Sequence, residues 1–395
     1  MNKQKIRMSS PDITQAEIDA VLEVLHSTDL SMGGQIQAFE EEMARIAGTQ
    51  YAVGVSSGTA GLHLAVIATG IGAGDLVLTS PFSFVASANC LLYEQAVPVF
   101  VDVDDQTGTL NWMAVDEAVE GILKGGKEAA RFLPRNMRGR EMKGLSVKGI
   151  LPVDVFMQTA DFDQLRDIAH RHHIILIEDS CEAVGAQYKG RMAGSLGDIG
   201  VMAFYPNKQM TTGEGGVIVT DNAEWAETSR SLRNQGRKPD ALWLEHDRLG
   251  YNYRLDEMSA AVGHIQAKRL QELLEKRKRV AFWYEERLRD VDVIRFPTVA
   301  PYTTSPSWFV YVIRILPPAS RDAVIVKLEE SGIPSRKYFS PIHLQPFYRT
   351  RFGYREGDFP VTERLGDQSL ALPFSGVMTE DEVDTVCFEL RKAIE

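Results

Sequence analysis

The stretch that decides the fold is residues 174–220, IILIEDSCEAVGAQYKGRMAGSLGDIGVMAFYPNKQMTTGEGGVIVT. It begins with an uninterrupted apolar run, Ile174 to Ile177, which ends abruptly in Glu178 and Asp179. A short run of this kind is typical of a strand that is buried on both faces of a parallel sheet. Because ligands of open α/β sheets bind at the carboxyl ends of the strands, the acidic pair predicts a ligand site, with Asp179 as the better candidate.

Asp179 has two interpretations. A carboxylate at this depth costs desolvation energy unless a positive partner keeps it ionised, and a protonated pyridine nitrogen is such a partner. Aspartate is also common as the N-cap of a helix that follows a strand. From Asp179 alone, the helix-cap interpretation is favoured over the ligand-binding one.

Lys208 lies later in the same stretch, between the aromatic and proline segment Phe204 to Pro206 and the glycine-rich turn Gly213 to Gly216. A lysine held there out of bulk water is a good nucleophile, and Schiff-base chemistry requires such an amine. Most lysines are solvated surface residues. The neighbours of Lys208 favour the nucleophile over that alternative.

A possible anion site precedes this stretch. The apolar run Val53 to Val55 leads into Ser56, Ser57, Gly58 and Thr59, and a helical pattern follows from Leu62 to Ile67. Such a junction exposes backbone N–H groups at a helix N-terminus with little side-chain bulk, which suits a phosphate. Similar turns are common without ligands, so this signal is weak by itself.

Outward from these segments, short apolar runs alternate with amphipathic stretches, which predicts a mostly parallel α/β sheet covered by helices. The strand-like runs are Leu76–Thr79, Val97–Val101, Gly149–Val155, Ile174–Ile177 and Val217–Val219. Two helical patterns, Pro11 to His26 and Ile36 to Ile46, precede the sheet, and residues 104–148 predict a helix and then a surface excursion. A long charged helix over Met258 to Arg289, a strand over Phe309 to Leu316 and a further helix predict a second, smaller domain.

Composition excludes several classes of protein. A net charge of −11 argues against a nucleic-acid-binding surface. The first ten residues contain no apolar run after their lysines, and no segment approaches the roughly 20 apolar residues of a membrane span. Three cysteines lie outside any zinc-like spacing, so we expect reduced, buried thiols and no metal site. We therefore expect a cytoplasmic globular protein.

In their order and spacing, these segments resemble the DegT/DnrJ/EryC1/StrS family of sugar aminotransferases. The resemblance covers nearly the whole chain. It includes Pro11–Ile13, Gly33–Glu40, Ser56–Leu62, Pro81–Ala86, Gln158–Asp163, Glu178–Asp179, Gly197–Gly200, Phe204–Gly216, Gly250–Arg254, Ala260–Ala261, Pro341–Pro346 and Leu372–Pro373.

The resemblance implies the fold of type I pyridoxal-phosphate (PLP) enzymes. Residues 1–257 would form a large PLP-binding domain with an N-terminal helical segment and a mostly parallel seven-stranded sheet. Residues 258–395 would form a smaller C-terminal α+β domain. The implied assembly is a homodimer with shared active sites.

The resemblance also implies roles for individual residues. Lys208 would hold the cofactor through a Schiff base and move the proton, and Asp179 would pair with the pyridinium nitrogen, which makes the ring an electron sink. Further cofactor contacts would come from Gly58, Thr59, Phe84, Glu182 and, across the dimer interface, Asn252. Arg254 and His343 are expected at the substrate; Arg237 is a further candidate, although surface charge explains it better.

Two residues depart from the family pattern. Ala203 stands where many members have a phosphate-contacting serine, so the phosphate needs another partner. Glu182 stands where many have glutamine, and its charge near the cofactor could alter the ionisation of the cofactor's hydroxyl. Position 208 is lysine and not the histidine of the family's dehydratases, which favours transamination.

The predicted function is transfer of an amino group from an amino acid, with glutamate the expected donor, to a nucleotide-linked keto-sugar for amino-sugar and polysaccharide biosynthesis. The run Met210 to Gly216 is more similar to members that act at C4 than to those that act at C3. Three alternatives stay open: a C3 keto-sugar, a free cyclitol ketone, and a non-catalytic regulatory protein. Intact Lys208 and Asp179 argue against the last.

Overall fold

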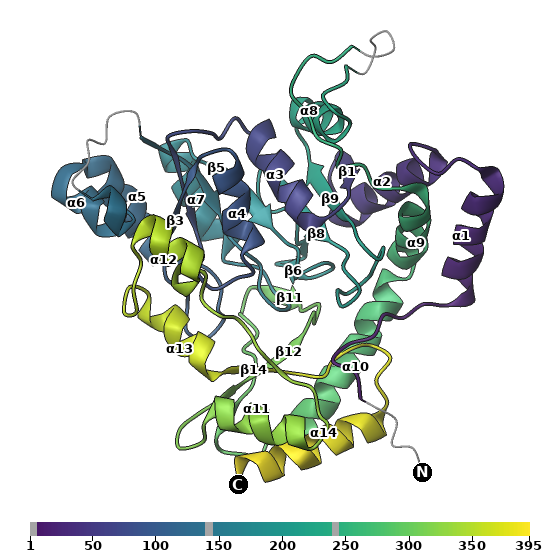
Figure 1. The fold of residues 1–395 in the computed structure, drawn as a ribbon, viewed down its shortest axis with the longest axis vertical. Coiled ribbons are helices and arrows are strands. Elements are labelled where there is room, and N and C mark those ends of the chain that lie inside the picture. The colour runs from purple at the N-terminus through teal and green to yellow at the C-terminus, as the bar shows by residue number, and fades with distance from the viewer. Residues whose placement is uncertain (1–5, 139–144, 239–244) are drawn as a thin grey trace.

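The computed structural model describes residues 6–138, 145–238 and 245–395 (Figure 1). At its centre is a seven-stranded sheet with the strand order β1-β9-β8-β5-β4-β2-β3. The strands are β1 Tyr51–Val55, β2 Asp75–Thr79, β3 Val97–Phe100, β4 Ser146–Leu151, β5 Ile175–Asp179, β8 Ile199–Ala203 and β9 Gly216–Thr220. β9 is antiparallel to both of its neighbours, β1 and β8, and the other pairs are parallel. The predicted mostly parallel α/β sheet is confirmed.

Helices cover both faces of this sheet because its strands are apolar on both sides. Neighbouring residues of β5 show the alternation: Ile177 belongs to the core formed with α3, α4 and α8, and Leu176 to the core formed with α5 and α7. These helices are α3 Gly58–Ala68, α4 Ala86–Tyr93, α5 Trp112–Lys124, α7 Phe162–His172 and α8 Ala223–Arg233. The two predicted N-terminal helices form as α1 Gln15–Ser27 and α2 Gly34–Ala47, and both pack against α9 Glu257–Lys268.

The C-terminal part has its own antiparallel sheet of four strands in the order β10-β12-β14-β13. It shares one hydrophobic core with three helices. These elements are α10 Leu270–Leu288, β10 Ile294–Arg295, β12 Tyr311–Ile315, α11 Arg321–Glu330, β13 Arg336–Lys337, β14 Ser369–Leu372 and α14 Glu380–Ile394. The predicted domain boundary after residue 257 falls at the start of α9, and α10 leads from there to the second sheet (Figure 1).

The remaining elements are short. They are α6 Gly126–Phe132, the 3-10 turn Arg135–Met137, β6 Gln187–Tyr188, β7 Arg191–Met192, β11 Thr303–Ser305, the 3-10 turn Ile342–Leu344, α12 Pro346–Phe352 and α13 Pro360–Gln368. Of the surface excursion predicted within residues 104–148, residues 139–144 lie outside the described residues. Across the three described ranges, no helix combines the length and the apolar character needed to cross a membrane.

The single helix predicted over Met258 to Arg289 is wrong, because the chain forms two helices there, α9 and α10, with a break at Arg269. Arg269 leaves the helical conformation with φ −92° and ψ 0°. Its guanidinium bonds Asp12 and Glu17, which lie in the N-terminal segment. The break thus occurs where a tertiary contact holds the arginine, which a local apolar pattern does not reveal.

Candidate active site

A cavity of about 420 Å³ lies at the carboxyl ends of the central strands, where a ligand was expected. Five of the predicted cofactor residues line it together with Lys208. Its lining residues are Ser57, Gly58, Thr59, Leu62, Ser83, Phe84, Ala86, Ser87, Val153, Asp179, Cys181, Glu182, Ala203, Tyr205, Asn207, Lys208, Glu214, Gly215, Phe309 and Tyr338. The fold therefore brings together segments that lie up to about 280 residues apart in the sequence, as crossover connections between parallel strands allow.

Lys208 reaches this cavity from the loop that connects β8 to β9, and its side chain is only 13% exposed. Its amine lies 3.8 Å from the centroid of the Phe309 ring and 3.7 Å from Oε1 of Glu182. An aromatic face and a carboxylate both attract a cation. The amine is thus held in one place, with the cavity open to it.

Asp179 ends β5 and is 3% exposed. Its Oδ2 accepts a hydrogen bond of 2.6 Å from the Ser87 hydroxyl, and its Oδ1 accepts one of 3.2 Å from the backbone N–H of Cys181. Within the described ranges no lysine or arginine forms an ion pair with it. The helix-cap interpretation is wrong, because a turn and not a helix follows β5.

The N-terminus of α3 forms another wall of the cavity. Ser57 caps this helix by accepting from the N–H of Ala60 at 3.1 Å, which leaves the first N–H groups, those of Gly58 and Thr59, at the cavity. A Cβ on Gly58 would lie 2.6 Å from the Cβ of Ala203. Only glycine fits there, so the backbone of α3 approaches β8 closely and presents its positive end to the cavity.

Glu182 is buried beside Lys208, and its Oε2 accepts a hydrogen bond of 3.3 Å from the backbone N–H of Phe156. Burial raises the pKa of Glu182 to about 7, although the Lys208 ammonium acts in the opposite direction. The residue therefore changes its charge near neutral pH, which the glutamine usual at this position cannot do.

This shifted pKa gives a first prediction, for the protein freed of its cofactor. The pKa of Glu182 is about 7 in the folded protein and about 4.5 in the unfolded chain. Its contribution to the free energy of unfolding is therefore most favourable below pH 4.5 and is lost as the pH rises through 7. We expect Glu182→Gln to reduce the loss of unfolding free energy between pH 5 and pH 8 by about 2 kcal/mol. Denaturant unfolding at the two pH values measures this.

Glu214→Gln is the matched control, because Glu214 also lines the cavity but is exposed. It should lose as much stability as the unaltered protein between the two pH values. Equal losses in the Glu182 and Glu214 variants would show that the Glu182 carboxyl titrates in its ordinary range.

Three predicted residues do not line the cavity of their own chain. Asn252 is exposed, and its backbone pairs with Asn234. Arg254 donates to the side-chain oxygen of Asn234 at 2.9 Å. His343 has no exposed surface; its Nε2 lies 3.0 Å from Oε1 of Glu363, and burial lowers its pKa. A fully buried ring has no face for a substrate, so this arrangement does not support the expected contact of His343.

Sequence reasoning missed several residues of the cavity wall, including two aromatic residues of the C-terminal part and two neighbours of Lys208. Phe309 and Tyr338 belong to the C-terminal part, Tyr205 and Asn207 flank Lys208, and all four line the cavity. Only the last two had a local signal, their closeness to Lys208. The expected burial of the cysteines holds for Cys90 and Cys387 but not for Cys181, which is half-buried at the cavity. Among the described residues, no three His, Cys, Asp or Glu side chains are placed to hold a metal ion.

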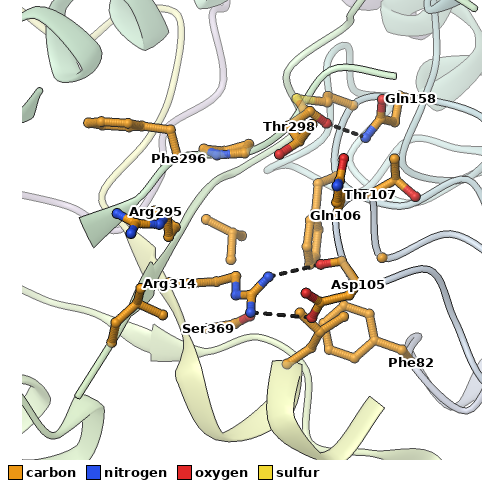
Figure 2. A pocket seen from close by; sticks show the side chains of 17 residues that line it. Phe82, Asp105, Gln106, Thr107, Gln158, Arg295, Phe296, Thr298, Arg314 and Ser369 are labelled. Carbon is orange, nitrogen blue, oxygen red and sulfur yellow. Dashed lines mark hydrogen bonds and ion pairs between the residues drawn. The ribbon is translucent and has the colours of Figure 1, made fainter. Parts of the chain in front are cut away.

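A second cavity, of about 290 Å³, lies where the loop that contains Asp105 meets the C-terminal sheet (Figure 2). Arg314 of β12 points to Asp105 there and donates to its carbonyl at 2.8 Å. Gln158 donates to the carbonyl of Thr298 at 2.8 Å. These bonds join the two parts of the chain, and no predicted site residue lines this cavity. The candidate site is therefore the cavity of Lys208.

Comparison with known proteins gives the same answer. Residues 11–391 match the DegT/DnrJ/EryC1/StrS aminotransferase family. The chain belongs to this family. It is a PLP-dependent aminotransferase with the fold of those enzymes.

Three relatives illustrate the similarity. GDP-perosamine synthase of Caulobacter vibrioides is 35% identical, with 99% of this chain and 98% of that protein covered. UDP-N-acetyl-3-dehydro-alpha-D-glucosamine 3-aminotransferase of Acidithiobacillus ferrooxidans is 33% identical over 94% of this chain and 92% of its own. The X-ray structure of S. venezuelae DesV, in complex with a ketimine intermediate, has a TM-score of 0.85 and 30% identity, and covers 100% of this chain and 99% of its own.

The residues of the cavity fit PLP. The buried carboxylate of Asp179 has two hydrogen-bond donors and no cation, so a protonated ring nitrogen would complete its partners. The N-terminus of α3 would supply N–H groups to the phosphate, which would offset the hydroxyl absent at Ala203. Phe84 is 62% exposed at the wall of the cavity and would lie against a bound ring.

When bound, PLP supplies an aldehyde that condenses with amines and a ring that takes up an electron pair. The residues of the chain would supply the other functions: the Lys208 amine would attach the group and, when released, would be a base beside the reacting carbon. Asp179 would keep the ring nitrogen protonated. Glu182 and the Phe309 ring lie 3.7 Å and 3.8 Å from the amine and hold it at the cavity.

Proposed function

We propose that this aminotransferase transfers an amino group from an amino acid, glutamate being the expected donor, to a keto-sugar carried by a nucleoside diphosphate. The amino group is placed at C4 of the sugar. The product is a nucleotide-linked amino sugar of the kind built into polysaccharides.

The shape of the site supports a substrate larger than a free sugar. A hollow of about 550 Å³ adjoins the cavity of Lys208 and shares Ser83 and Phe84 with it. Its wall includes Phe347, whose side chain is 53% exposed. Aromatic side chains of this kind bind planar rings by stacking. A sugar in the first cavity could thus extend its nucleotide into the second, which is the observation that favours a nucleotide-linked substrate over a free cyclitol ketone.

The names of two relatives agree with this substrate class, since one contains GDP and the other UDP. The second is named for a 3-amino transfer. The preference for C4 rests instead on the run Met210 to Gly216, which forms the loop between Lys208 and β9.

The substrate class can be tested directly. The enzyme is first converted to its aminated form with glutamate, and the glutamate is then removed. We expect one nucleotide-linked 4-keto-sugar of a panel to return the enzyme to its aldehyde form. The panel contains GDP- and UDP-linked 4-keto and 3-keto sugars and a free cyclitol ketone, and absorption of the cofactor reports the turnover. A response to a 3-keto sugar alone would contradict the C4 assignment, and a response to the free ketone alone would contradict the nucleotide-linked class.

We also propose that two copies of the chain share each site. The single chain leaves large apolar side chains exposed: Ile18, Leu22 and Leu25 on α1 are each 46–48% exposed, and Tyr93 is 52% exposed. Such surfaces are usually covered by a partner. The side chain of Asn252 is also exposed. The next residue, Tyr253, accepts through its carbonyl from the N–H of Ser56 at 2.9 Å, and Ser56 adjoins Ser57 in the wall of the cavity.

A mixed dimer tests the shared site. A Lys208→Ala chain paired with an Asn252→Ala chain would form one site with both defects and one with neither, because a two-fold dimer builds each site from both chains. Co-refolding equal amounts should restore about a quarter of the original activity, since about half of the dimers are mixed and each has one intact site. The Asn252 variant must itself be impaired. Activity that never exceeds the mean of the two separate preparations would show that Asn252 is not shared.

A further inference from the structure

A buried arginine of the helix α10 connects the loop of Lys208 to the segment that contains Phe309, just before β12. Arg277 is 4% exposed, and among the described residues its guanidinium donates to four backbone carbonyls. Nη1 donates to Phe309 at 3.0 Å and to Trp308 at 3.4 Å; Nη2 donates to Asn207 at 3.2 Å and also to Lys208. One planar group thus spans two segments about 100 residues apart in the sequence.

This arrangement is unusual for a buried charge. Within the described ranges no carboxylate forms an ion pair with Arg277, and burial lowers its pKa to about 10, so it is still charged at neutral pH. Burying an unpaired cation costs several kcal/mol after relaxation. The four carbonyl bonds offset that cost, and an apolar side chain would leave the carbonyls without donors.

The two segments that Arg277 joins meet at the reactive amine. Phe309 provides the ring that lies 3.8 Å from the Lys208 amine. The N–H of Phe309 donates to the carbonyl of Phe156 at 2.7 Å, and the N–H of Phe156 donates to Glu182, the other partner of that amine. Phe156 itself has a φ of 63°, a strained backbone for a bulky residue, which persists only where its surroundings fix it.

We propose that Arg277 is a positioning residue: by holding the Lys208 loop and the Phe309 segment together, it keeps the aromatic ring against the Lys208 amine. Arg277 does not line the cavity of Lys208. Its role goes beyond the reaction class and the substrate proposed above, since any transamination at Lys208 would depend on it.

Arg277→Lys is the sharpest test, because lysine keeps the positive charge and some of the hydrogen bonds but cannot span both segments with a planar fork. We expect kcat to fall about tenfold or more, since a displacement of about 1 Å at a reacting group can cost about 10²-fold. KM should change less than about threefold, because no side chain of the substrate cavity is altered.

A second readout needs no turnover. In the protein freed of cofactor, the rate at which acetic anhydride acylates Lys208, located by mass spectrometry, reports how closely the amine is held against the Phe309 ring. We expect Arg277→Lys and Phe309→Leu each to raise this rate several-fold, because each separates the amine from the ring. Arg279→Lys is the matched control on the same helix; Arg279 is exposed over Trp283, and this variant should match the original protein.

A double-mutant cycle completes the test. If Arg277 acts through Phe309, Arg277→Lys in the Phe309→Leu background should change kcat and acylation by less than about twofold further. The proposal would be overturned if the fold-changes of the two single variants multiplied in the double variant. It would also be overturned if Arg277→Lys lowered the thermal stability but left acylation and kcat unchanged. If Arg277→Lys does not fold, the test rests on Phe309→Leu. Unchanged acylation of Lys208 in that variant would also overturn the proposal.

Discussion

Lys208→Ala is expected to abolish transamination, with kcat lowered at least about 10³-fold. The variant loses both the amine that attaches PLP and the base that moves the proton, and general acid–base catalysis alone contributes about 10²–10⁴-fold. In the described residues no other lysine lines the cavity. We expect the absorption band of covalently attached PLP to disappear as well, which a spectrum of the purified protein shows without any substrate.

Lys124→Ala is the control for this experiment, since Lys124 is an exposed residue in the last turn of α5. That variant should keep the absorption band and full activity. A Lys208→Ala protein that turned over at the original rate would sink the assignment of the site, whatever its fold.

Much of the central sheet could be predicted from the sequence because most of its strands contain a short apolar run. The predicted run Ile174 to Ile177 falls in β5 except for Ile174, which precedes it, and Val217 to Val219 lies within β9. A strand buried on both faces needs apolar side chains at every position, and this requirement is visible locally. The predicted run Gly149 to Val155 extends past the end of β4 at Leu151, where Val153 makes only an isolated bridge to Asp179.

Features that depend on distant residues could not be predicted in this way. The break between α9 and α10 occurs at Arg269, whose partners Asp12 and Glu17 lie about 250 residues earlier. The burial of His343 depends on Glu363, which belongs to α13. Neither contact leaves a local pattern, because helix propensity and apolar spacing describe only neighbours along the chain.

The residues of the candidate site also fall into those that a local motif reveals and those that it does not. Asp179 ends β5, Gly58 begins α3 and Lys208 lies in the loop between β8 and β9, and the motif around each of them is contiguous in the sequence. Phe309 and Tyr338 come from the C-terminal part and look like core aromatics in the sequence. Arg277 looks like one of several charges on an amphipathic helix, and only its four carbonyl partners distinguish it from exposed Arg279.

Asp179→Asn should leave PLP bound but lower kcat about 10²–10³-fold, the usual cost of removing one group that stabilises charge at a reacting centre. The amide keeps the size of the side chain and can still meet Ser87, so the cavity should not collapse. It has no negative charge, however, and cannot keep the ring nitrogen protonated, so the ring takes up the electron pair less readily. Steady-state kinetics together with the amount of bound cofactor separates the two effects.

Ser87→Ala is the informative companion to Asp179→Asn, because it removes the hydrogen bond of 2.6 Å to Asp179 and leaves the carboxylate charge in place. A lost hydrogen bond to a charged group costs about 1.5–3 kcal/mol at most, and Asp179 retains the N–H of Cys181, so we expect a fall in kcat of about tenfold. The order of the two effects decides the role of Asp179. If Asp179→Asn turned over like the original enzyme, or lost no more than Ser87→Ala, the carboxylate would only shape the turn after β5, and the charge on the ring nitrogen would have to be held by another group.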